Sequence, residues 1–144
     1  MESRQIHRYP LTVQFDEVDQ YGIVHHPRYF IYMERARVEL MGMLGMRPDG
    51  PEDRKLGLVV VSAEAKFRAS ARFLDQLVVE QGCRAVGASR VELLYRIARG
   101  ATTIAEALLT LAFVDQTGRP VRAPDGLRDG LRGMAVPETA FGRA

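Results

Sequence analysis

The sequence predicts an α+β fold in which one long helix lies against an antiparallel sheet of five or more strands. Between residues 27 and 44, apolar residues recur at spacings of three and four, which is the period of a helix. From residue 58 onward apolar and polar residues alternate, which is the period of a strand. Short glycine-containing segments separate the later strands, so hairpins are expected between them.

The chain should begin with a strand at 9–15 and an acidic loop from Asp16, followed by the long helix. Pro27 has no backbone N–H and its φ is fixed near a helical value, so it suits the first position of a helix. We therefore expect His26 to be the residue just before the helix. A segment rich in glycine and proline then predicts a loop at 45–57.

The later strands are expected at 58–69, 76–86, 90–98 and 103–114. After Gly118, frequent prolines and glycines predict a loop with at most a short helical turn. The expected division is one domain at 1–124 and a tail at 125–144 that is a loop or a short helix. Because one helix can cover only one face of the sheet, the other face or the sheet edge should meet water or a second copy of the chain.

The composition restricts the classes of function. With 144 residues and 47% hydrophobic content, the chain can bury one core. Its 20 basic and 18 acidic residues are interleaved, without the basic clusters that are typical of nucleic-acid-binding proteins. Cys83 is the single cysteine, which excludes an internal disulfide and a multi-thiolate zinc site. The absence of a membrane-spanning apolar run and of a signal peptide makes a cytoplasmic protein the expectation.

The loop before the long helix is the candidate active site. The start of a helix presents unpaired N–H groups and a partial positive charge, so it can polarise a carbonyl group. Asp19 lies a few residues upstream and could act as a carboxylate there. His25 and His26 are adjacent, so their side chains diverge, and no zinc-ligand spacing accompanies them. No metal site is therefore expected.

Residues 19–29, with the sequence DQYGIVHHPRY, resemble the active-site loop of hotdog-fold thioesterases. The similarity is greatest to the branch of 4-hydroxybenzoyl-CoA and short-chain acyl-CoA thioesterases. It continues through 33–37 and 67–77. The resemblance implies a hotdog fold, in which an antiparallel sheet wraps one long helix.

The resemblance also implies roles for individual residues. Asp19 would be the catalytic carboxylate, acting either as a nucleophile or as a general base. The His26 amide would stabilise the carbonyl oxygen, and its side chain would either orient substrate or water or have no role of its own. The remaining substrate-binding candidates are Gly22, His25, Tyr29, Phe30, Arg68 and Arg90. Among them, Gly22 would permit the tight loop, and the two arginines could meet coenzyme A phosphates.

Other carboxylates compete with this assignment. Asp19 could merely cap a turn or the helix, as loop aspartates commonly do. Asp16 and Glu17 are neighbours that could have a perturbed pKa or simply be exposed. A second hotdog branch uses a glutamate of the helix, for which Glu34 is the candidate. Some members carry a tyrosine four residues before the catalytic aspartate, and this chain has Phe15 there.

The expected activity is hydrolysis of an acyl thioester, with coenzyme A or a phosphopantetheine carrier protein as the acyl carrier. The carrier-protein alternative would belong to polyketide or fatty-acid metabolism. No metal or redox cofactor is implied, and a homodimer or homotetramer with active sites between subunits is expected. A hotdog dehydratase and a non-catalytic acyl-thioester binding module remain alternatives.

Overall fold

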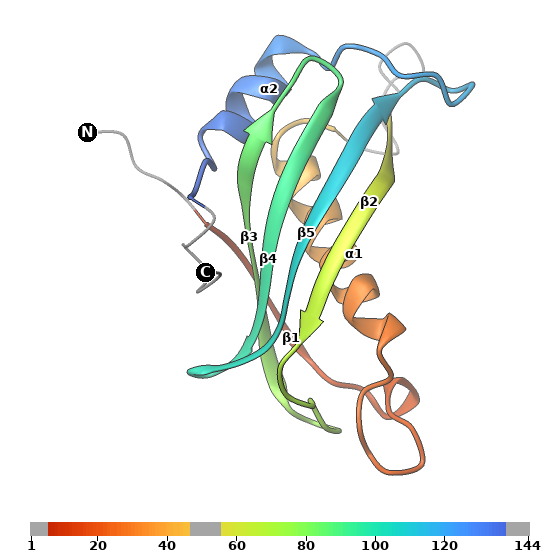
Figure 1. Cartoon of the computed structure of the whole chain (residues 1–144), viewed down its shortest axis with the longest axis vertical. Helices are drawn as coiled ribbons and strands as arrows, with labels where there is room; N and C mark the ends of the chain where they lie inside the picture. Colours follow the sequence, from red (N-terminus) through yellow and green to blue (C-terminus); the bar gives the residue numbers. More distant parts are fainter. Residues whose placement is uncertain (1–5, 47–55, 138–144) are drawn as a thin grey trace.

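The computed structural model describes residues 6–46 and 56–137, which form one antiparallel sheet and two α-helices (Figure 1). The sheet has the strand order β1-β3-β4-β5-β2, and all neighbouring strands are antiparallel. The elements are β1 (His7–Thr12), a 3-10 helix η1 (Phe15–Glu17), α1 (Pro27–Met43), β2 (Gly57–Phe67), β3 (Gln76–Val86), β4 (Arg90–Arg99), β5 (Thr102–Val114) and α2 (Asp125–Arg132). The α+β class and the order of elements predicted from the sequence are confirmed.

The first strand is the main error among the predicted boundaries. It was expected at 9–15, but β1 ends at Thr12 and Phe15 already belongs to η1. The cause is local, because the Gln14 amide donates to the Glu17 carboxylate at 2.8 Å and the Glu17 amide returns to the Gln14 carbonyl at 3.1 Å. These bonds turn the chain out of the sheet. Most of the loop expected at 45–57 lies outside the described residues.

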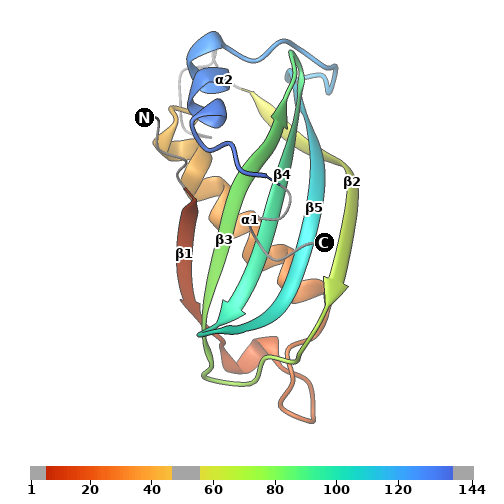
Figure 2. The same cartoon turned by 60° about the vertical axis from the view of Figure 1, so that its left-hand side comes forward.

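The long helix α1 lies across one face of the sheet (Figure 2). Its start is at the end of the molecule where β1 and β2 finish, and its end is near α2. The buried side chains of α1 are those of Tyr29, Tyr32, Met33, Ala36, Arg37, Leu40 and Met41. Each large apolar side chain buried here contributes about 1.5–3 kcal/mol of transfer free energy, so this face holds the helix on the sheet.

The alternation predicted for 90–98 is confirmed in β4. Val91, Leu93, Tyr95 and Ile97 are all at most 1% exposed and belong to the core between the sheet and α1. On the opposite face, Leu94 is also fully buried, because Val136 from the C-terminal segment packs over it. The outer face of the sheet is therefore partly covered by the chain itself.

Charged residues form a row across the outer face of all five strands. The register places Arg8 of β1 opposite Glu80 of β3, Glu80 opposite Arg96 of β4, Arg96 opposite Glu106 of β5, and Glu106 opposite Lys66 of β2. We call these five residues the outer-face charge row. Glu80 forms ion pairs with Arg8 at 3.2 Å and with Arg96 at 3.0 Å. The signs alternate along the whole row, so cross-strand neighbours attract one another.

The C-terminal segment is more ordered than the expected helical turn, because it contains the eight-residue helix α2. Leu127 and Leu131, one turn apart, are buried in the same core as α1 and the sheet. Gly130 lies against Leu44, where a Cβ atom would come within 2.7 Å of the leucine side chain. Tertiary packing thus outweighs the poor helix propensity of the two glycines in this helix.

The edge strand β2 is largely exposed. Within the described residues its only strand partner is β5, so its other edge is open. Val59, Val60 and Val61 are 45–49% exposed along this edge. An open edge with exposed valines is the kind of surface that pairs with another strand.

Candidate active site

The candidate site lies on the loop that connects η1 to α1. Within this loop the Asp19 amide donates to the Ile23 carbonyl at 2.9 Å, and the Gly22 amide donates to the Asp19 carbonyl at 2.9 Å. Gly22 has a φ of +79°, a conformation that glycine adopts without the steric cost of a side chain. These features close 19–23 into a tight turn.

The Asp19 carboxylate is fixed by this turn and is exposed to solvent. Its Oδ1 accepts hydrogen bonds from the Tyr21 amide at 2.8 Å and from the Ile23 amide at 3.2 Å. This is the turn-capping role that was expected as the alternative to a catalytic role for Asp19. Within the described residues Oδ2 accepts no hydrogen bond, so one oxygen orients the side chain and the other is available.

The loop is held against the segment that follows β2. The Val24 amide donates to the Ala71 carbonyl at 2.9 Å, and the Phe73 amide donates to the Gly22 carbonyl at 3.4 Å. The Tyr29 hydroxyl accepts a hydrogen bond from the Ala71 amide at 3.1 Å. Burial raises the pKa of Tyr29, so this phenol stays neutral. Tyr29, one of the predicted substrate-binding candidates, is 2% exposed and supports the loop through this hydrogen bond.

Glu17 is a buried support for the loop and the helix. Its Oε1 accepts hydrogen bonds from the Gln14 amide at 2.8 Å and from the Tyr32 hydroxyl at 2.9 Å, and Arg35 lies 3.4 Å from Oε2. The pKa of Tyr32 is raised, first by burial and then by the Glu17 carboxylate. The backbone carbonyl oxygen of Glu17 also accepts a hydrogen bond from the His25 amide at 3.2 Å. These contacts account for Glu17 as a structural residue.

The two other competing carboxylates are exposed. Asp16 contributes its carbonyl oxygen, to which Arg28 Nη2 donates at 3.3 Å. Glu34 is on α1, eight residues beyond His26, and lines a pocket further along the helix. Neither carboxylate is tied to the loop around Asp19 by a hydrogen bond among the described residues.

The helix start leaves one amide free. His26 is the residue before α1, as expected, and its side chain does not cap the helix. The preceding His25 amide donates to Glu17, and the Tyr29 amide donates to the His26 carbonyl at 3.2 Å. Within the described chain the His26 amide has no acceptor. A free N–H at the positive end of a helix can bind a carbonyl oxygen as charge develops on it.

An aromatic cluster lies at the helix start. The ring of Phe67, at the end of β2, lies 4.8 Å from the His26 ring, 5.6 Å from the Tyr29 ring and 6.4 Å from the Phe30 ring, centroid to centroid. Phe67 is 41% exposed. Phe67 was not among the predicted site residues, although it ends β2 within the alternating pattern.

The remaining predicted residues are dispersed. His25 is exposed on the loop, and Arg68 follows Phe67 but is paired with Glu106 at 3.0 Å. Arg90 is exposed at the first residue of β4, at the opposite end of the sheet from the helix start. Within one chain the structure therefore brings together Gly22, Tyr29 and Phe30 with the helix start, but not Arg90.

Comparison with known proteins identifies the family. A sequence model described as the thioesterase-like superfamily matches residues 13–131. The chain belongs to the thioesterase-like superfamily. The match includes the Asp19 loop, α1, the strands β2 to β5 and most of α2.

The names of two relatives of this chain describe them as thioesterases. The acyl-CoA thioesterase YbgC of Haemophilus influenzae is 28% identical over 108 residues, covering 74% of this chain and 79% of the relative. The chloroplastic acyl-acyl carrier protein thioesterase ATL3 of Arabidopsis thaliana is 27% identical over 126 residues, covering 86% of this chain and 66% of the relative.

Solved structures agree with this assignment. A probable thioesterase from Bartonella henselae superposes with a TM-score of 0.78 and 26% identity, covering 83% of this chain and all of that one. The hotdog fold expected from the resemblance is confirmed, and the superfamily member is an enzyme of the thioester-hydrolase class.

Proposed function

We propose that this protein hydrolyses acyl thioesters with Asp19 as the catalytic carboxylate and the His26 amide as the oxyanion donor. The observation that carries the proposal is the free His26 amide at the start of α1, directly after the loop that orients Asp19. The names of relatives acting on acyl-CoA and on acyl carrier proteins support these two substrate classes.

Two routes are consistent with this arrangement. In the first, Asp19 Oδ2 attacks the thioester carbon, the thiolate leaves, and water then cleaves the resulting anhydride. In the second, Oδ2 takes a proton from water as the water oxygen attacks the same carbon, and the thiolate leaves with that proton. Both routes build negative charge on the carbonyl oxygen beside the His26 amide, where one donor is worth on the order of 3 kcal/mol.

We also propose a homodimer as the minimal assembly, with a homotetramer as its extension. Support comes from the open edge of β2 and its exposed Val59, Val60 and Val61. Pairing of two such edges would satisfy backbone groups that otherwise face water. Phe67 is on the same strand, so the candidate site would lie close to the interface.

Arg68 and Arg90 remain candidates for binding the phosphates of the acyl carrier. Arg68 would have to exchange or share its partner Glu106, whereas Arg90 forms no ion pair among the described residues. Because Arg90 is at the far end of the sheet, it would reach a carrier bound at the site of another subunit rather than at its own. No described helix is long and apolar enough to cross a membrane, and the cytoplasmic location remains a prediction.

The variant Asp19→Asn tests the catalytic assignment. Asparagine keeps an Oδ1 that can accept the Tyr21 and Ile23 amides, so the turn and the thermal midpoint should be preserved. Loss of the carboxylate should lower the rate of free-thiol release from acyl-CoA and acyl-carrier substrates by at least roughly 100-fold. Substantial residual turnover would refute the role of Asp19.

Two further results separate the alternatives. Single turnover in ¹⁸O-labelled water places the label in the Asp19 side chain only if Asp19 is the nucleophile. Tight binding of an acyl thioester by the wild-type protein without release of thiol would instead indicate a binding module.

A further inference from the structure

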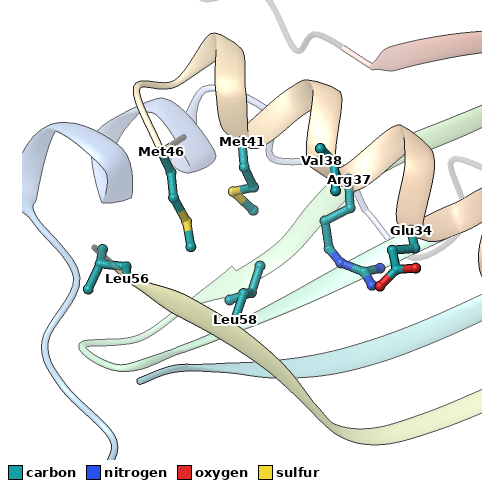
Figure 3. Close-up of a pocket in the computed structure, with 7 residues that line it drawn as sticks. All are labelled: Glu34, Arg37, Val38, Met41, Met46, Leu56 and Leu58. Carbon is teal, nitrogen blue, oxygen red and sulfur yellow. The ribbon is translucent and has the colours of Figure 1, made fainter. Parts of the chain in front are cut away.

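A pocket lies between the second half of α1 and the start of β2 (Figure 3). It has a volume of about 170 Å³. Its walls are formed by Glu34, Arg37, Val38, Met41, Met46, Leu56 and Leu58. Five of these side chains are apolar. The two polar ones, Glu34 and Arg37, lie together at one end of the pocket in Figure 3, with Met46 and Leu56 at the other.

One stripe of α1 connects the candidate oxyanion amide to this pocket. His26, Phe30, Glu34 and Val38 follow one another at intervals of four residues, which places them along the same side of a helix. Met41 continues the stripe three residues later. A ligand whose carbonyl oxygen rests at His26 can therefore extend along this side of the helix into the pocket.

Strand β2 forms the opposite wall over the same distance. It runs antiparallel to α1, since Phe67 at its end contacts Phe30 near the helix start and Leu58 at its start lines the pocket with Met41. Figures 1 and 2 show the same relative direction of the two elements. The site and the pocket therefore lie along one α1–β2 boundary.

We infer that the pocket holds the distal part of the acyl chain, and that the preferred substrates are long-chain acyl thioesters of about 12–16 carbons. This inference rests on the proposed function. It names Val38, Met41 and Leu58 as residues that determine specificity.

The chain length follows from two dimensions. Eight residues of helix separate His26 from Glu34, a rise of about 12 Å, which an extended chain covers in on the order of ten bonds. An apolar cavity of about 150 Å³ holds a benzene molecule, so this pocket has room for roughly six further carbon atoms. Acyl groups of four to eight carbons, and single aromatic rings, end before the pocket begins.

The buried arginine does not require a charged ligand. Arg37 Nη1 donates to the Tyr95 hydroxyl at 3.1 Å, and both side chains are buried. The head group is thus held toward the core, while the methylene stem can form part of the pocket wall. This arrangement is compatible with an unsubstituted alkyl chain.

The experiment is a chain-length profile of kcat/KM with butanoyl-, octanoyl-, dodecanoyl- and hexadecanoyl-CoA. Each methylene that enters the pocket should raise kcat/KM about four-fold. About two methylenes of a dodecanoyl chain pass the ten-bond distance to the pocket and none of an octanoyl chain does, so kcat/KM should rise on the order of ten-fold from octanoyl- to dodecanoyl-CoA. Leu58→Trp fills the pocket and should lower the ratio of hexadecanoyl to butanoyl kcat/KM by at least about ten-fold.

Met43→Trp is the control, because Met43 is 69% exposed on α1, outside the edge of β2, and does not line the pocket. It should keep the wild-type ratio. Val38→Trp approaches the pocket from the helix side and replaces Leu58→Trp if that variant does not fold. Equal kcat/KM for all four substrates, or an equal effect of Leu58→Trp and Met43→Trp, would overturn the inference.

A binding measurement separates this inference from the proposed function. Hexadecanoate, but not octanoate, should raise the thermal midpoint of the wild-type protein, and Leu58→Trp should abolish the rise. If no thioester is hydrolysed, the proposed function fails while this measurement still decides the pocket. If thioesters are hydrolysed and hexadecanoate gives no shift, the pocket assignment fails alone.

Discussion

The imidazole ring of His26 and the phenyl ring of Phe67 pack with their centroids 4.8 Å apart. One residue precedes α1 and the other ends β2, so the contact joins the helix start to the edge strand. The His26 side chain therefore packs on a residue of the strand whose open edge is the proposed subunit interface.

Phe67→Ala should lower kcat/KM for acyl thioesters by up to about ten-fold, because an aromatic pair contributes about 0.5–1.5 kcal/mol. Steady-state kinetics of thiol release measure the effect. Phe73→Ala is the control, since Phe73 is similarly exposed and packs on Phe15 instead. An unchanged kcat/KM in Phe67→Ala would show that the contact has no role in turnover.

Glu17→Ala should lower the free energy of unfolding by about 2–3 kcal/mol, because it leaves the Tyr32 hydroxyl and the Gln14 amide without their acceptor. Urea denaturation measures this loss. Asp16→Ala, at the exposed neighbouring residue, should change stability by less than about 0.5 kcal/mol. Equal stability of the two variants would contradict the structural role of Glu17.

A charge on the open edge of β2 should separate the proposed dimer. Val60→Lys is expected to elute at the mass of one chain, 16.1 kDa, while the wild-type protein elutes at twice this mass or more. Leu74→Lys, a comparable change at an exposed residue outside β2, should keep the wild-type elution. A wild-type protein that elutes as a monomer at every concentration would rule out the dimer.

Alkaline pH should destabilise the fold. Burial raises the pKa of Cys83 from 9.0 to about 12 and that of Tyr95 from 10.0 to about 12. Above their unfolded values the unfolded chain loses these protons and the folded chain keeps them, so stability is full below about pH 9 and falls as the pH rises toward 12.

Urea midpoints between about pH 8 and pH 11 measure this loss, with about 1 kcal/mol expected from Cys83 alone between pH 9 and pH 10. Cys83→Ala should lose less stability than the wild-type protein over that first interval and decline more steeply above it, where the buried phenols of Tyr29, Tyr32 and Tyr95 contribute. Constant stability of the wild-type protein up to pH 11 would contradict the prediction.

The regular elements could be predicted because their periods are local properties of the sequence. Pro27 defines the helix start, and the alternation from Val91 to Ile97 defines β4. The end of β1 could not be predicted, because the two hydrogen bonds between Gln14 and Glu17 favour a turn over continuation of the strand. Helix α2 was underestimated because it depends on packing against the core.

The candidate site could be proposed from the sequence only where it is continuous in the chain. Asp19 and His26 are close in sequence, so the resemblance of one segment proposes them together. Phe67 joins His26 only through the antiparallel course of β2 and α1, which periodicity does not reveal. The ion pair of Arg68 with Glu106 also depends on how the strands pair, so the sequence could not show that this candidate for phosphate binding has a carboxylate partner within the chain.

The outer-face charge row constrains how this family member can diverge. Each interior member, Glu80, Arg96 or Glu106, has neighbours of opposite sign on both sides. Reversing one interior sign places like charges next to each other twice, whereas exchanging the signs of a pair at the end of the row, Arg8 with Glu80 or Glu106 with Lys66, does so only once. We therefore expect descendants of this sequence to change the charges of such a pair together, so that a substitution on one strand is accompanied by a substitution on the neighbouring strand.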